Sequence, residues 1–446
     1  MCRYLLPLAV ILELLALASA ASELSVAAGG LLLAYFLAMA ARLQGYTRGL
    51  FLIALLVVFG SYALGRLNPA QLADAAASAA FYAAFLASLG TMQCLVRRFE
   101  VLRRVHDVLL GGPPVWLYPK YAVTSCLVAS VLSFGVMSLL CGSLSQTLSQ
   151  RGITGPSRLR WIRSVLISVL RGFALVPLVA PTSVAVAIIT REVPSLSWSQ
   201  LLPFGLASAL LMVLVGWVLE YRRFRWVSKE RVSLAGWPKG SGLLVLVVVA
   251  VLALMALLVA LTGFNVSRAA MLAVPTVTLV FMVAQDRSLL TVLKEAGDNV
   301  NAMSNEMAIF AASAAIGVAL ITQVPEGVVS QLVDLHTGPY LLALAGLLLL
   351  PLLSALGVIP ITTLSVIAGL LPPLAELGMD PLLLSVALVI GFALAMMLSP
   401  FGPSVMLLSR FGQVSRWLVA FGWNGVFVLI LLPLLMALLA VWYALM

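Results

Sequence analysis

Apolar runs of about 20 residues recur along the whole chain, with short polar connectors between them. A run of this length forms a helix that spans the ~30 Å hydrocarbon core of a bilayer. No connector is large enough to bury a soluble core, so the chain is expected to form one membrane domain. The predicted crossings are 4–21, 24–41, 49–66, 75–96, 163–190, 199–220, 243–262, 269–285, 297–323, 382–409 and 418–444.

Two further apolar segments, 119–148 and 338–375, decide the topology. If each crossed the membrane once, the basic groups at 97–104 and 151–163 would lie on opposite faces. If each is a re-entrant hairpin, all 26 Lys and Arg residues except Arg66, Arg191 and Arg268 are cytoplasmic. Positive charge concentrates on the cytoplasmic side of membrane proteins. The sequence therefore predicts hairpins, with the N-terminus and the connector 97–112 inside, and the connector 324–337 and the C-terminus outside.

An internal repeat divides the chain. Residues 172–198 align with 391–417 without a gap, at a shift of 219, with 8 identities in 27 positions. Five crossings per half, an odd number, invert the second half relative to the first. We therefore predict an all-α polytopic protein of about 11 transmembrane helices, with an extra helix (1–23), a first inverted repeat (24–220), a basic cytoplasmic linker (221–242) and a second repeat (243–446). Residues 1–20 also resemble a secretory signal peptide, although Glu13 interrupts the run and favours an uncleaved helix.

Composition and charge exclude several classes of protein. The chain is 63% hydrophobic and 9% charged, far from the average of a soluble domain. The net charge of +10 comes from short loops between spans, which argues against nucleic-acid binding and for contact with lipid headgroups. The four cysteines and two histidines form no metal-binding spacing. No Walker motif, cofactor fingerprint or nucleophile–base pattern indicates an enzyme.

The candidate chemistry lies first where two aligned crossings are interrupted. Proline breaks a spanning helix, and the break is tolerated only where it lines a cavity or is buried in protein. Interruptions at equivalent positions of two repeats point to a midplane transport site, and a packing kink in each helix is the alternative. The residues of these breaks are Pro181, Thr182, Ser183, Ser399, Pro400, Gly402 and Ser404.

The middles of the two hairpins give a second pair of candidate binding segments. Glycine, proline and small hydroxyl residues suit a tight turn whose backbone faces a ligand. A turn without a ligand, or small residues that pack helices together, is the alternative. The residues are Ser133, Gly135 and Ser138 in the first hairpin, and Gly357, Pro360, Thr362 and Thr363 in the second.

One acidic residue inside a crossing is a candidate proton carrier. Glu306 lies about a third of the way into the crossing 297–323, where an unpaired charge is costly. It carries a coupling proton or pairs with a neighbouring helix, and the sequence favours neither. Glu13, in the extra helix, is interpreted as structural.

Residues 354–417 resemble the C-terminal half of the large membrane subunit of TRAP transporters, through the hairpin, the connector LLPPLAELGMDP and the proline-broken crossing. The segments VRRFEVLRRVHDVLLGG and LVAPTSV are similar to the N-terminal half of that subunit. The resemblance implies the ion-transporter superfamily fold, elevator-type alternating access, sodium coupling and a carboxylate substrate. It also implies a periplasmic binding protein and a small membrane subunit as partners.

The expected function is therefore secondary transport of a small organic anion across the bacterial inner membrane, coupled to Na⁺ or H⁺ and without a cofactor. The alternative is a structural or accessory membrane protein whose site has decayed.

Overall fold

The computed structural model describes residues 2–96, 98–99, 109, 114–132, 135–142, 144, 155–227, 241–325, 327 and 338–445. Every regular element among these residues is a helix. The first half contains α1 (Cys2–Ser19), α2 (Ser22–Met39), α3 (Gly45–Ala63), α4 (Pro69–Gly90), α5 (Gln93–Val96), α8 (Leu117–Leu132), α9 (Gly135–Gly142), α11 (Gly155–Phe173), α12 (Val176–Val179), α13 (Val184–Glu192) and α14 (Trp198–Val227).

The second half contains α15 (Ser241–Thr262), α16 (Val266–Asp286), α17 (Leu289–Ala302), α18 (Ser304–Ile321), α20 (Pro339–Ala355), α21 (Pro360–Ala368), α22 (Leu371–Glu376), α23 (Pro381–Leu398), α24 (Pro403–Gly412) and α25 (Asn424–Leu445). A short π-helix, Leu418–Trp423, precedes α25. The predicted crossing 297–323 is wrong in one respect, because the chain forms two helices there, α17 and α18, which meet at Met303.

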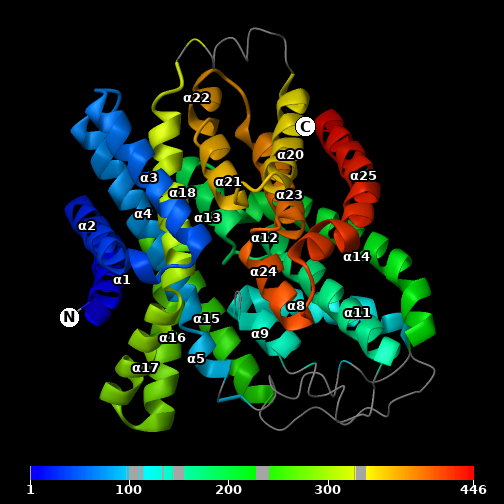
Figure 1. The fold of residues 1–446 in the computed structure, drawn as a ribbon. Helices are drawn as coiled ribbons and strands as arrows, with labels where there is room; N and C mark the ends of the chain where they lie inside the picture. Colours follow the sequence, from blue (N-terminus) through cyan, green and yellow to red (C-terminus); the bar gives the residue numbers. More distant parts are fainter. Residues whose placement is uncertain are drawn as a thin grey trace.

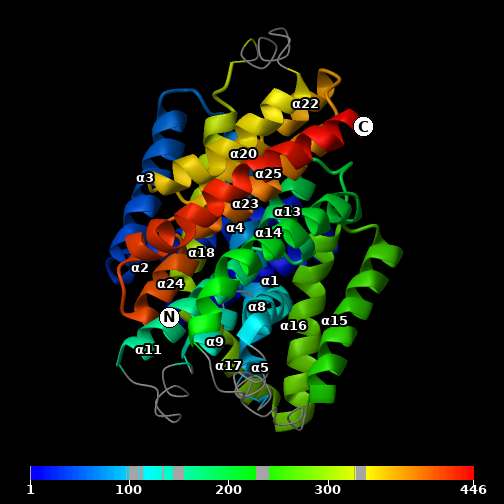
Figure 2. The same ribbon diagram turned by 90° about the vertical axis from the view of Figure 1, so that its right-hand side faces the viewer.

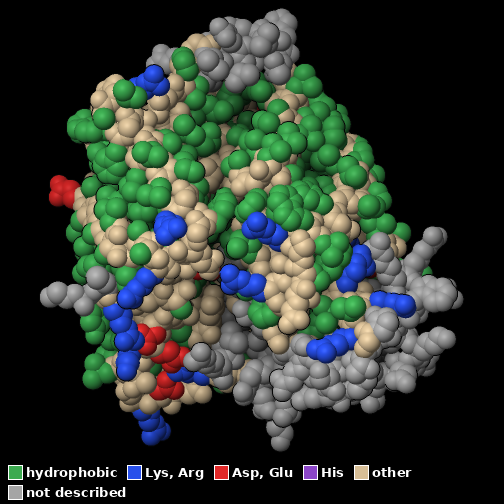
Figure 3. All heavy atoms as spheres, in the orientation of Figure 1, with side chains coloured by type: hydrophobic (Ala, Val, Ile, Leu, Met, Phe, Trp, Pro, Cys, Tyr) green, Lys and Arg blue, Asp and Glu red, His purple; other side chains and the backbone are tan. Residues whose placement is uncertain are grey.

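Ten helical segments of the described chain are long and apolar enough to span a bilayer. They correspond to ten of the predicted crossings, and α1 is a further helix of 18 residues in the position of the first. The protein is therefore a multi-pass membrane protein. Figure 3 shows hydrophobic side chains over most of one face, with Lys and Arg gathered towards its lower half.

The helix ends that flank the basic segments lie together at one end of the molecule. The end of α5 and the starts of α11 and α15 lie at the lower end in Figures 1 and 2, whereas the end of α18 and the start of α20 lie at the upper end. This arrangement is the one that two hairpins predict. The side of the membrane that each end faces stays a prediction.

The second predicted hairpin corresponds to α20, α21 and α22. The chain turns between α20 and α21, at Gly357, whose φ of 109° favours glycine. Both views show α22 at the end of the molecule from which α20 starts. The first predicted hairpin contains α8 and α9, and its residues 133–134, 143 and 145–148 lie outside the described part of the chain.

Candidate substrate and ion site

Two helices are interrupted at equivalent positions. The first break, residues 180–183, separates α12 from α13, and the second break, residues 399–402, separates α23 from α24. Their first residues, Ala180 and Ser399, have extended φ/ψ angles of −95°/131° and −81°/108°. Their last residues, Ser183 and Gly402, have −74°/139° and −65°/140°. The two breaks therefore share a backbone conformation, at the shift of 219 found in the sequence.

The two breaks start their following helices differently. The Ser183 hydroxyl accepts a hydrogen bond from the Ala185 amide at 3.2 Å and so caps α13. Gly402 has no side chain to cap α24, which begins with Pro403. In the second break the Ser404 hydroxyl donates to the Met396 carbonyl at 3.1 Å and so bridges the interruption.

The turn of the second hairpin reaches the same region. Pro360 is the first residue of α21, and its fixed φ suits that position. The Thr362 hydroxyl lies 2.7 Å from the Ser313 hydroxyl of α18, and both side chains are buried. Thr363 Oγ1 and Ser399 Oγ are buried without a hydrogen-bond partner among the described residues. Buried hydroxyls without partners are uncommon, and here they lie next to the predicted binding segments.

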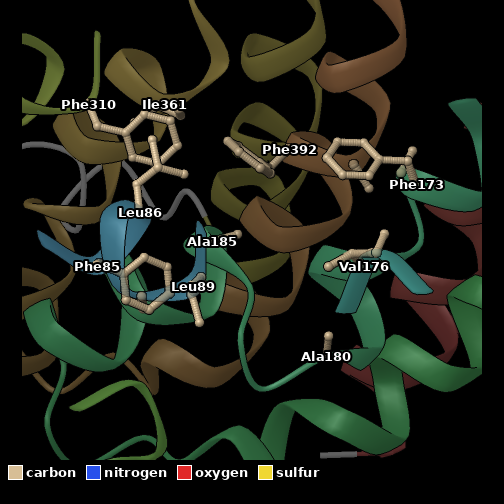
Figure 4. Close-up of a cluster of buried hydrophobic side chains, with 14 of the residues drawn as sticks. Phe85, Leu86, Leu89, Phe173, Val176, Ala180, Ala185, Phe310, Ile361 and Phe392 are labelled. Carbon is tan, nitrogen blue, oxygen red and sulfur yellow. The ribbon is translucent and has the colours of Figure 1, made fainter. Parts of the chain in front are cut away.

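These segments surround a cavity of about 70 Å³, which we call the central cavity. Five predicted residues line it: Thr182, Ser183, Pro360, Gly402 and Ser404. The rest of its described wall is apolar, with residues of α4, α8, α11, α12, α18, α21 and α23. In Figure 4, Leu86, Phe310 and Ile361 lie on one side of this region, and Phe173, Val176 and Phe392 on the other.

Three helices begin at the wall of the central cavity: α13 at Val184, α21 at Pro360 and α24 at Pro403. The first amide groups of a helix lack partners within it, and the helix dipole places partial positive charge there. The cavity is therefore suited to an anionic group in otherwise apolar surroundings.

The other predicted residues are not among the described residues that line the central cavity. Pro181 lines a groove next to it, and Pro400 is buried within the second break. Gly357 packs against Phe401, since a Cβ there would lie 3.2 Å from that ring. Gly135 begins α9, Ser138 lies within α9, and Ser133 lies outside the described residues.

Glu306 does not line the central cavity. It lies in the first turn of α18 and lines a separate cavity of about 70 Å³ with Gln44, Asn305 and Arg410, which we call the polar cavity. Pro403 lines both cavities. Glu306 and Arg410 therefore bring opposite charges to a site that adjoins the second break.

Two arginines at equivalent positions of the repeats contact the rest of the protein differently. Arg191 lies in the last turn of α13, donates to the Ser78 hydroxyl of α4 at 2.8 Å and lies 4.6 Å from the Phe81 ring centroid. Arg410, its equivalent in α24, lies at the polar cavity.

The sequence analysis missed a buried charged cluster, because Arg171 was counted with the cytoplasmic charge. Arg171 is 2% exposed, inside a predicted crossing, and its Nη1 lies 3.5 Å from Glu220 Oε1 of α14. Its Nε donates to Asn424 Oδ1 at 3.0 Å, and its Nη2 donates to the Trp423 carbonyl at 3.1 Å. An arginine inside an apolar run was the available signal in the sequence.

No protein-family model and no curated protein matches this chain. Solved structures do match it. The YdaH transporter of Alcanivorax borkumensis is 16% identical with a TM-score of 0.56, and the match covers 81% of this chain and 84% of that one. MtrF of Neisseria gonorrhoeae, described as representing a class of antimetabolite efflux pumps, is 13% identical with a TM-score of 0.55, and the match covers 80% of each chain. At this level of identity the comparisons establish the fold, which this chain shares with both of these membrane transporters.

Proposed function

We propose that the protein is a secondary active transporter that moves a small organic anion across the membrane in which it lies. The observation that carries the proposal is the meeting of three helix N-termini at one cavity, two of them at interruptions related by the repeat. Such paired interruptions are typical of secondary-transporter binding sites. The transporter fold of the neighbouring structures supports the same function.

An anion fits this site better than a cation does. Charged side chains are absent from the described wall of the central cavity, so the charge of the ligand is met by helix N-termini and hydroxyl groups. A carboxylate can accept hydrogen bonds from the Ser183 hydroxyl and from the first amide of α13. At α24, Pro403 has no N–H, so the first donors are the Ser404 amide and the Ser404 hydroxyl, which must turn away from the Met396 carbonyl. The resemblance to TRAP transporters favours the same class of substrate.

The coupling ion is Na⁺ or H⁺ in this proposal. Carbonyl groups at Ala180 and Ser399 lie where their helices end, and such carbonyls can coordinate Na⁺. Glu306, next to Arg410 in the polar cavity, is the candidate for carrying a proton. In the proposed transport cycle, the hairpins and broken helices move against the remaining helices and carry the site across the membrane, as in an elevator-type transporter.

The rival is an accessory membrane protein that keeps the fold without transport, and the mainly apolar wall of the central cavity favours it. An uptake assay distinguishes the transporter from the accessory protein. Purified protein in proteoliposomes is tested for uptake of organic anions with and without a Na⁺ or H⁺ gradient. Gradient-dependent uptake is expected. A protein that binds no anion and gives no flux under any gradient would support the rival.

Replacing Ser183 is expected to weaken substrate binding at least tenfold. A hydrogen bond to a charged group contributes about 1.5–3 kcal/mol, which corresponds to a factor of ten or more in affinity. Ser183→Ala also removes the cap of α13, at about 1 kcal/mol of stability, whereas a glycine cap costs only a few tenths of that. Ser183→Gly, the residue found at the equivalent position 402, therefore separates the two effects.

We expect Ser183→Gly to lower transport affinity while thermal stability changes little. We expect Ser404→Ala to lower transport affinity and also to cost about 1 kcal/mol of stability, because it removes the hydrogen bond to the Met396 carbonyl. Ser208→Ala and Ser385→Ala are the controls, since both serines are buried in spanning helices outside the described wall of the cavity. If the break variants keep wild-type affinity for solute and ion, the site has been misplaced.

Replacing Glu306 with glutamine is expected to abolish uptake driven by a pH gradient and to leave counterflow exchange intact. Glutamine keeps the size of the side chain and its hydrogen bonding but cannot carry the proton. Uptake driven by ΔpH and exchange at equal pH are compared in the same proteoliposomes, with Asn305→Ala as the neighbouring control. An unchanged dependence on ΔpH would make Glu306 a structural acid.

A further inference from the structure

A groove of about 430 Å³ lies next to the first break, and we call it the lateral groove. Its wall comes from α8, α15, α16, the segment after α4 and the first break. Met92, Met255 and Val274 are buried in its wall. Ser130 and Thr182 are the only polar residues in the described wall.

The lateral groove opens on the outer surface of the protein. Leu127 of α8 is 65% exposed, and Val249 and Leu252 of α15 are 53% and 51% exposed, although all three line the groove. Val249 and Leu252 belong to a predicted spanning segment, so this mouth faces the bilayer. Figure 2 shows α15 at the edge of the molecule beside α16.

The lateral groove adjoins the central cavity. Thr182 lines both spaces, and its hydroxyl donates to the Ser130 carbonyl at 2.6 Å. This hydrogen bond between α8 and the first break therefore lies where the lateral groove and the central cavity adjoin. Beyond it are Ser183 and the start of α13, the end of the site suited to a negative charge.

We propose that the transported anion carries an alkyl chain and reaches the site from the bilayer. Its chain lies in the lateral groove, and its carboxylate reaches the first break, at Thr182, Ser183 and the N-terminus of α13. The inference rests on the proposed function and names the substrate class for it.

The size and chemistry of the groove support this occupant. The groove is about six times as large as the central cavity (430 against 70 Å³), and an apolar cavity holds water poorly. A chain in the groove therefore stays in apolar surroundings as it leaves the bilayer. Its charged head moves to the helix N-terminus, where an anion is stabilised. A small dicarboxylate would occupy the central cavity and make no use of the groove.

The test is photolabelling of the whole protein in proteoliposomes with palmitate that carries a diazirine near the end of its chain. We expect labelled peptides from α8 and α15. Val249→Trp fills the groove and should reduce labelling at least tenfold. Leu246→Trp, on the same helix at a position that is 61% exposed and does not line the groove, should leave labelling unchanged.

The methyl ester of the same probe separates a recognised anion from a lipid chain that only fills space. We expect the acid to label at least tenfold more than the ester, and Ser183→Gly to reduce this preference. Equal labelling by acid and ester, or equal labelling of the two tryptophan variants, overturns the inference.

The outcomes for this inference and for the proposed function differ. If short carboxylates are transported and palmitate does not label the groove, the inference fails and the transporter proposal stands. If palmitate labels the groove as an anion and no anion flux is found, the proposed transport fails and the binding site stands.

Discussion

Replacing Arg171 with alanine is expected to lower the free energy of unfolding by about 3–5 kcal/mol, because it leaves a buried carboxylate without its nearest buried cation. Glu220 is 0% exposed, and Arg163, which also lies 3.7 Å from its Oε2, has a side chain that is 25% exposed. The substitution also removes the hydrogen bonds to Asn424 and to the Trp423 carbonyl. The guanidinium carbon lies 4.1 Å from the Phe427 ring centroid, so a cation–π contact is lost as well.

Unfolding of the purified protein in detergent, followed by heat and by chemical denaturant, measures this effect. Arg171→Lys keeps the charge but cannot reach three partners with a planar fork, so an intermediate loss is expected. The double variant Arg171→Met/Glu220→Met should recover much of the stability, because replacing a buried pair with apolar residues is often neutral. If the free energy of unfolding of Arg171→Ala lies within 1 kcal/mol of the wild-type value, the cluster contributes little to stability.

Replacing Gly172 with alanine is expected to destabilise the protein by about 1–3 kcal/mol or more, as overpacking does in a close-packed interior. A Cβ at Gly172 would lie 2.2 Å from the carbonyl oxygen of Ala122, where α11 crosses α8. Because that atom belongs to the backbone, the two helices must separate to admit a methyl group. The displaced helix, α8, carries Ala129 at the wall of the central cavity, so substrate affinity should fall too.

The equivalent glycine of the second repeat should tolerate the same change better. A Cβ at Gly391 would lie 3.0 Å from the Leu347 carbonyl oxygen of α20, so a shift of a few tenths of an ångström relieves the contact. Gly30→Ala is the control, since nothing lies within 4 Å of its Cβ position in α2. Among the three variants, we expect thermal stability to be highest for Gly30→Ala, lower for Gly391→Ala and lowest for Gly172→Ala. A Gly172→Ala variant as stable as Gly391→Ala would contradict this packing.

These two glycines also explain the repeat found in the sequence. Each one begins the shared Gly-Phe-Ala-Leu segment, and each one lies where a broken helix crosses the first helix of a hairpin segment, α8 or α20. A glycine allows two backbones to approach closely inside a membrane protein. The identity of the two segments therefore reflects the same crossing in each half.

Several features could be predicted from the sequence alone, because they depend on local physics. The length of an apolar run decides whether a helix can span a bilayer, and ten predicted crossings correspond to spanning helices. Proline removes a backbone hydrogen bond, so Pro181 and Pro400 located both breaks before any fold was known. Proline alone does not mark a break, because Pro203, Pro275 and Pro433 lie inside continuous helices. The repeat was the second signal that singled out Pro181 and Pro400. The shift of 219 then placed Ser183 opposite Gly402, and the dihedral angles of the two residues agree.

Other features were decided only by the tertiary structure, because they depend on which helices come together. Pro181 lines the lateral groove and not the central cavity, since α8 and α15 pack beside it. Phe173, Phe310 and Phe392 come from three helices far apart in the chain, and no local pattern shows that they enclose one apolar space. Arg171 was counted with the cytoplasmic positive charge, although it lies inside the predicted crossing 163–190. Its partners Glu220 and Asn424 lie 49 and 253 residues away along the chain, so only packing could show that it is buried and paired.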